Sequence, residues 1–283
     1  MAILRIPGIW LLAAMTWLGV PLQAAYVELG EFSDDLSLFS PSTAWNPGPN
    51  TARISDHSSP GSATFSIMGA GFLVDAAGAT GTGHGEATTS SLITDLGVPS
   101  FVESDYADLI NTTLNIWATV SGFTNLGQVA DGGADAGAPE ANGGHLGDIR
   151  VAAWTINEPT VLAHAFQPGT ESIFADGTIA GDIHIDVPRT WVDQPNDSVF
   201  DQDIDLFTVV LHELGHALGL GHSNVTGSVM EPIYSGGRRT LHTDDIAGIR
   251  SLYGIPELGT AILMALGSIA LMRRQQRIGA RIL

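Results

Sequence analysis

The 283-residue chain contains no cysteine and no lysine. Without cysteine it cannot form a disulfide. All eleven basic residues are arginines, and with 30 acidic residues they give a formal net charge of −19. So acidic a chain argues against nucleic acid or an anionic membrane surface as a partner. It suits calcium binding and solubility, and general solubility with no specific partner is the simpler interpretation.

The N-terminal end has the pattern of a secretory signal. Arg5 precedes an apolar run over 9–20, and small residues follow at Ala24 and Ala25. A charged start, an apolar core and a small-residue cleavage site are typical of a signal peptide. We therefore expect residues 1–25 to be removed on export. The alternative is an uncleaved membrane anchor.

Residues 255–283 form a second address signal. Pro256 and Glu257 precede an apolar run of about 15 residues, which is shorter than the roughly 20 needed to cross a bilayer. The arginines that follow should stay cytoplasmic. This order is similar to the PEP-CTERM sorting tail of Gram-negative bacteria, with Leu258 where that family has proline. The resemblance implies cell-surface or extracellular location, transient membrane association and removal by an exosortase-type protease. The alternative is a plain membrane anchor.

The most informative stretch reads H-E-x-x-H-x-x-G-x-x-H. Its fixed positions are His212, Glu213, His216, Gly219 and His222. Residues 205–217 favour a helix, on which positions four apart point the same way, about 6 Å apart along the axis. His212 and His216 can therefore share one ion. Gly219 suits the end of the helix, since glycine adopts left-handed backbone conformations easily. The chain can then turn back and bring His222 to the same ion.

Three imidazoles leave the fourth position of a tetrahedral zinc open, as in catalytic sites. Zinc lowers the pKa of a water there to about 7. Glu213 lies on an adjacent part of the helix face, where it can reach that water without being a ligand. We expect it to take the proton as the general base.

These residues resemble the metzincins and, among them, the matrixins. Ser223 after the third histidine is the matrixin choice, and Met230 fits the Met-turn beneath the zinc. Pro232 and Tyr234 match a P-x-Y segment that forms one wall of the specificity pocket. The alternative within the clan is a serralysin-like protein. The resemblance covers about 62–254, which we expect to be the metalloprotease domain.

The fold that the resemblance implies is an α+β metzincin domain. It has a twisted mixed sheet, a backing helix, the active-site helix and a C-terminal helix. We expect strands over 63–72 and 148–154 and a backing helix over 102–120, with Trp117 in the core. Residues 180–186 should lie on the edge strand that binds substrate. Thr243 is the expected N-cap of the last helix, with Gly254 at its far end.

The resemblance also implies calcium. Asp148 and Asp182 match the two carboxylates of a family calcium site, and oxygen ligands suit such a hard cation. Asp186 matches a ligand of a second calcium site, whose usual glutamate is replaced here by Arg189.

A second, structural zinc is a further expectation from the family. His164 and His184 match two of its four ligands, and the loop that carries the other two has no counterpart in the chain. Two histidines alone do not complete a tetrahedral site. Glu158 or Asp176 could substitute. The alternative is that both histidines are simply hydrogen-bonded.

Residues 26–61 are rich in serine, proline, aspartate and glycine and predict a leader or short pro-segment. Because there is no cysteine, the thiolate latch of animal matrixin propeptides cannot operate. Asp34 or Asp35 could occupy the zinc instead; the alternative is a solvated leader.

Taken together, the motifs predict a zinc-dependent endopeptidase whose substrate is an extended peptide or protein. Two alternatives remain: a calcium- and zinc-stabilised surface or matrix protein without catalysis, and a peptidase dedicated to a single envelope or matrix protein. The intact Glu213 argues against the first, because a retired site has no chemical use for a base.

Overall fold

A computed structural model describes residues 61–73, 87–136, 147–168, 181–194 and 203–256. The predicted signal peptide, the leader up to residue 60, the sorting tail from residue 257 and Asp176 lie outside these residues. Within them, no helix is long and apolar enough to cross a membrane.

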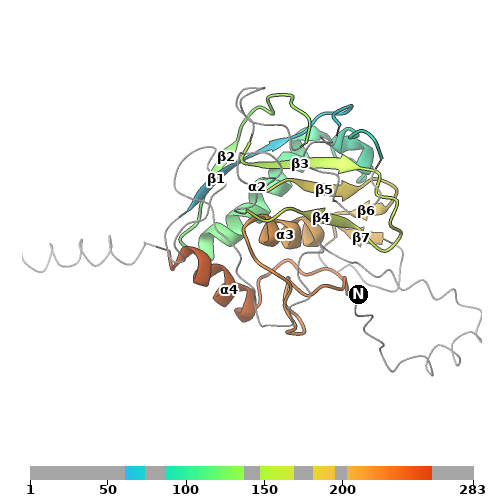
Figure 1. Cartoon of the computed structure of the whole chain (residues 1–283). Helices are drawn as coiled ribbons and strands as arrows, with labels where there is room; N and C mark the ends of the chain where they lie inside the picture. The colour runs from blue at the N-terminus through green and yellow to red at the C-terminus, as the bar shows by residue number, and fades with distance from the viewer. Residues whose placement is uncertain (1–60, 74–86, 137–146, 169–180, 195–202, 257–283) are drawn as a thin grey trace, which may run out of the picture.

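A five-stranded sheet in the order β2-β1-β3-β5-β4 is the centre of the domain (Figure 1). Its strands are β1 (Ser62–Ile67), β2 (Thr124–Gln128), β3 (Ile149–Trp154), β4 (Ala163–Ala165) and β5 (Ile183–Asp186). β4 runs antiparallel to β5, and the other neighbours are parallel. The predicted mixed sheet is therefore confirmed.

The central strand β3 is buried on both faces, as its apolar sequence favours. Successive side chains of a strand point to opposite faces. Val151 and Ala153 accordingly join the main core, whereas Ala152 and Trp154 join a smaller cluster with Met68.

The main core is covered by helices. α2 (Glu103–Val120) and α3 (Leu206–Ala217) pack against each other, α3 lies next to β4, and α4 (Thr243–Tyr253) packs on α2 (Figure 1). Trp117 is fully buried, and its indole Nε1 donates to the carbonyl of Leu211 at 2.9 Å. The predicted backing helix and the core position of Trp117 are thus confirmed.

Two smaller elements complete the described fold. The short helix η2 (Ile93–Leu96) buries Ile93 and Leu96 in the main core. The parallel pair β6 (Thr190–Val192) and β7 (Asp203–Asp205) lies outside the large sheet. β7 leads directly into α3, so this pair helps to fix where α3 begins.

Three sequence predictions were wrong in detail. The strand predicted over 63–72 ends at Ile67, because the chain turns at Ala70 and Gly71, the latter with φ 89°. The predicted edge strand over 180–186 is β5, which pairs with β3 on one side and β4 on the other, so the edge strand is β4.

The third correction concerns the start of α4. His242, and not Thr243, is its N-cap, since His242 Nδ1 accepts from the amide of Asp244 at 3.2 Å. The carboxylate of Asp245 accepts from the amide of His242 at 2.7 Å, which completes a capping box. The sequence analysis looked for a serine or threonine N-cap and missed His242, because histidine is rarely an N-cap.

Candidate metal centre and active site

Helix α3 positions two of the three histidines. It begins at Asp205, whose carboxylate accepts from the amide of Thr208 at 3.2 Å and from its hydroxyl at 2.6 Å. It ends at Ala217, and Gly219 has φ 101°, the left-handed conformation that the sequence predicts for a glycine there. The chain then turns back towards the helix at His222.

The structure brings together the three histidines that the sequence predicts as zinc ligands. The Nε2 atoms of His212 and His216 are 2.9 Å apart, and the potential ligand atoms of His212, His216 and His222 all lie within 4.8 Å of one another. Within the part of the chain that the structure describes, this is the one group of three or more metal-binding side chains so close together. Three imidazole nitrogens are a donor set that fits zinc.

Backbone carbonyls orient two of the imidazoles. His212 Nδ1 lies 2.6 Å from the carbonyl oxygen of Val229, and His216 Nδ1 lies 2.7 Å from that of Leu220. A carbonyl only accepts, so each Nδ1 carries the proton and each Nε2 keeps its lone pair for a metal. Sequence reasoning missed both carbonyls, because any residue type supplies one.

The electrostatics of the site suit a bound cation. Burial, followed by the neighbouring His216 and His222, lowers the pKa of His212 well below its usual value. Burial raises the pKa of Glu213 well above its usual value. Glu213 is fully buried, and neither of its carboxylate oxygens has a hydrogen-bond partner. Because buried carboxylates are normally paired, this one indicates a charge or proton that the chain itself does not supply.

The Met-turn packs against the active-site helix. Met230 is fully buried, and a Cβ built on Gly215 would lie 2.3 Å from its Sδ. The buried carboxylate of Asp245 accepts from the amides of Val229 at 2.9 Å and Met230 at 3.2 Å, and from the hydroxyl of Ser228. The sequence analysis did not identify this support of the turn by Asp245.

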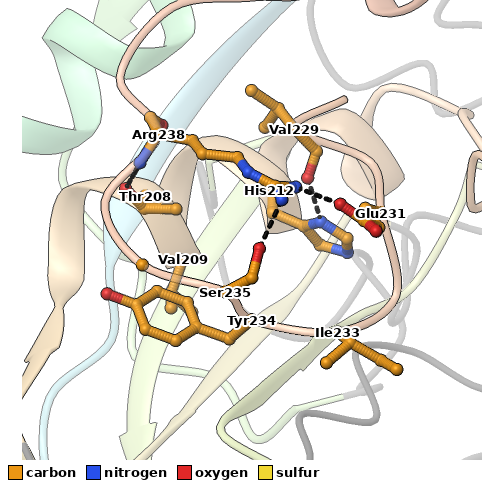
Figure 2. A pocket seen from close by; sticks show the side chains of 10 residues that line it. Thr208, Val209, His212, Val229, Glu231, Ile233, Tyr234, Ser235 and Arg238 are labelled. Atoms are coloured by element: carbon orange, nitrogen blue, oxygen red, sulfur yellow. Dashed lines mark hydrogen bonds and ion pairs between the residues drawn. The ribbon is translucent and has the colours of Figure 1, made fainter. Parts of the chain in front are cut away.

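A pocket opens beside His212 between α3 and the loop after Met230 (Figure 2). It is lined by Thr208, Val209, His212, Val229, Glu231, Ile233, Tyr234, Ser235, Gly236 and Arg238. Tyr234 is one of the lining residues, and its hydroxyl accepts from the amide of Asp205 at 2.9 Å. Pro232 lies in the same segment, outside the lining.

The candidate calcium ligands have different surroundings. Asp148 accepts from the amide and the hydroxyl of Thr64, both at 2.7 Å. Asp182 is buried with one oxygen, Oδ2, unpartnered. Burial raises the pKa of Asp182 to about 7, although Arg150 and His184 act in the opposite direction. An orphaned buried carboxylate oxygen fits a hard cation such as calcium.

Asp186 does not fit the second calcium site. Its Oδ1 accepts from the amide of Ile156 at 2.8 Å, and its Oδ2 accepts from Arg189 Nε at 2.5 Å. The guanidinium of Arg189 thus supplies the positive charge that the resemblance expects from calcium. Asp186 therefore helps to hold this loop together.

His164 and His184 face each other across β4 and β5, with ring centroids 4.9 Å apart. The indole of Trp154 stacks on His184 at 4.6 Å. Glu158 is exposed, and Asp176 lies outside the described residues. Among the residues that the structure describes, no third metal-binding side chain joins the pair. Two donors alone do not complete a structural zinc site.

Comparison with known proteins agrees with this geometry. A family model described as Matrixin matches residues 98–254, more than half of the chain. Karilysin from Tannerella forsythia is 43% identical over 96 residues, which cover 34% of this chain and 18% of that protein. Matrix metalloproteinase-25 from Mus musculus is 45% identical over 98 residues, covering 33% and 14% of the two chains.

Interstitial collagenase from Bos taurus is 35% identical over 157 residues, which cover 55% of this chain and 30% of that protein. The chain thus spans less than a third of the length of each of these relatives. The extent of the family match decides between the two metzincin interpretations. The chain belongs to the matrixin family.

Proposed function

We propose that the chain is a zinc-dependent endopeptidase, with His212, His216 and His222 as the zinc ligands and Glu213 as the general base. The observation that carries the proposal is the convergence of three imidazoles beside a buried, unpartnered carboxylate. When bound, zinc supplies Lewis acidity, which polarises a carbonyl and acidifies water.

The residues of the chain handle the proton. Glu213 takes a proton from the attacking water, whose oxygen joins the peptide carbonyl carbon. The same carboxyl group then gives the proton to the leaving nitrogen as the C–N bond breaks, so the products are a carboxylic acid and an amine.

The sheet provides a place for an extended substrate. β4 is an edge strand of the large sheet, and it lies next to α3. An edge strand can pair with an extended peptide through backbone hydrogen bonds. We propose that the substrate lies along β4, with a side chain beside the scissile bond in the pocket next to His212.

We also propose that Asp148 and Asp182 bind calcium and that both ends of the chain are processed. Support for calcium is the unpartnered oxygen of Asp182. For residues 1–25 and 255–283 the support is their sequence pattern. We propose export to the cell surface or beyond, with the tail acting as the sorting and membrane signal.

The test is hydrolysis of casein or gelatin by the purified full chain. Activity should disappear with a zinc chelator and return when zinc is added back. Failure to cleave either protein, or any shorter peptide, with zinc present in the site would contradict the proposal.

A further inference from the structure

The pocket beside His212 contains an ion pair. Arg238 Nη1 lies 2.6 Å from Glu231 Oε2 (Figure 2). Glu231 directly follows Met230, and Arg238 lies seven residues further along the same loop. Both residues line the pocket. The side chain of Glu231 is 24% exposed, and that of Arg238 is 21% exposed. The pair therefore joins the two ends of the loop that forms one wall.

Arg238 is held in this position from several directions. Its Nη1 also donates to the carbonyl of Ser228 at 2.6 Å, and its Nη2 donates to the hydroxyl of Ser235. Its backbone amide donates to Thr208 Oγ1 at 2.7 Å, which fixes the residue to the first turns of α3. Loop residues thus bind the guanidinium of Arg238, while the backbone of Arg238 is hydrogen-bonded to α3 on the opposite wall of the pocket.

These contacts limit what can enter. A long apolar side chain would strip water from the ion pair without offering it a new partner, which is unfavourable for charged groups. An acidic or basic side chain would meet one attractive and one repulsive charge. A short neutral side chain avoids both of these penalties.

We infer that the Arg238–Glu231 pair in the wall of this pocket restricts the substrate residue beside the scissile bond to short, uncharged side chains. This inference rests on the proposed peptidase function. It assigns the selectivity to two charged residues of this chain that the sequence motif does not include.

The test uses the full zinc-loaded chain and peptides that differ only at the two positions flanking the cleaved bond. We expect kcat/KM at one of these positions to be at least tenfold higher with alanine or valine than with leucine, phenylalanine, glutamate or arginine. In Arg238→Ala the preference for alanine over leucine should fall at least tenfold. Arg250→Ala, which removes an arginine from α4, should keep the wild-type preference. An unchanged preference in Arg238→Ala would overturn the inference.

A binding measurement separates this inference from the proposed activity. The same peptides are titrated by calorimetry into zinc-loaded Glu213→Ala and into Glu213→Ala combined with Arg238→Ala. A preference for short side chains that is lost with Arg238 supports the inference even if the wild type cleaves nothing. Equal affinities for all peptides in both proteins would overturn it even if cleavage occurs.

A milder variant covers the case in which Arg238→Ala does not fold. Arg238→Lys keeps a positive charge opposite Glu231 and loses the second donor to Ser235. We expect an intermediate preference, with melting temperature and zinc content near those of the wild type. A wild-type preference in this variant, together with a wild-type preference in Glu231→Gln, would contradict the assignment.

Discussion

The Nδ1 atom of His212 lies 2.6 Å from the carbonyl oxygen of Val229. A candidate zinc ligand on the active-site helix is thus oriented by the residue just before Met230 in the Met-turn. The turn is fixed in its place by the buried carboxylate of Asp245, to which the amides of Val229 and Met230 donate. Support for the metal centre therefore extends from α4 through the Met-turn to the imidazole.

The first prediction concerns this support. Asp245→Asn places an amide NH₂ among groups that donate, and we expect it to lower the free energy of unfolding by about 2–4 kcal/mol. Zinc affinity should fall about ten- to 100-fold, as for other residues that orient metal ligands. Thermal unfolding and zinc titration measure the two effects.

Asp244→Asn is the matched control, because Asp244 is only partly buried and accepts from the hydroxyl of Ser223. We expect it to change stability by less than about 1 kcal/mol. Equal effects of the two substitutions would remove the assigned role of Asp245.

The second prediction concerns the start of the active-site helix. The buried Asp205 caps α3 through Thr208, and its carboxylate also accepts from Arg239 Nε at 3.0 Å. Asp205→Ala removes the cap and leaves Arg239 without its buried partner. We expect a loss of about 3 kcal/mol, measured by chemical denaturation.

Asp193→Ala provides the comparison, since Asp193 pairs with the same Arg239 from a side chain that is 37% exposed. Exposed ion pairs contribute little, so its loss should cost less than about 1 kcal/mol. A larger loss of stability in Asp193→Ala than in Asp205→Ala would show that the buried N-cap does not stabilise the start of α3.

The third prediction follows from the pKa of Asp182, which burial raises to about 7. A carboxyl group whose pKa is raised in the folded state stabilises the fold below its unfolded pKa near 3.9, and this contribution is lost as the pH rises through 7. With a calcium chelator present, wild-type stability should therefore fall between about pH 4 and pH 7 relative to Asp182→Asn. Added calcium should restore the wild type at pH 8 and leave Asp182→Asn unchanged.

In the metal-free protein, titration of His212 changes stability with pH in the direction opposite to that of Asp182. Its lowered pKa makes stability fall as the pH drops below about 6.5. This effect is common to the wild type and Asp182→Asn, so it cancels when the two are compared. Parallel pH profiles, with no response to calcium in either protein, would contradict a cation at Asp182.

Particular residues show what the sequence could predict. The spacing of His212, His216 and His222 required a helix followed by a turn at Gly219, and both are present. Periodicity also placed the backing helix correctly. Local patterns do not say which strand lies at a sheet edge, so the edge position was assigned to β5 instead of β4.

Other features depend on groups far apart in the sequence. The carbonyl of Val229 on His212 leaves no mark in the side-chain sequence, and neither does the position of Asp245 beneath the Met-turn. The pairing of Arg238 with Glu231 depends on how the loop after Met230 folds back. These are tertiary contacts, and only the folded chain displays them.

The most direct test of the central claim compares the wild-type full chain with Glu213→Ala, measuring proteolysis and bound zinc for both. The account predicts zinc in both proteins and cleavage by the wild type alone, because Glu213 moves the proton while the three histidines hold the metal. Absence of zinc from both proteins, or equal cleavage by the two, would contradict it.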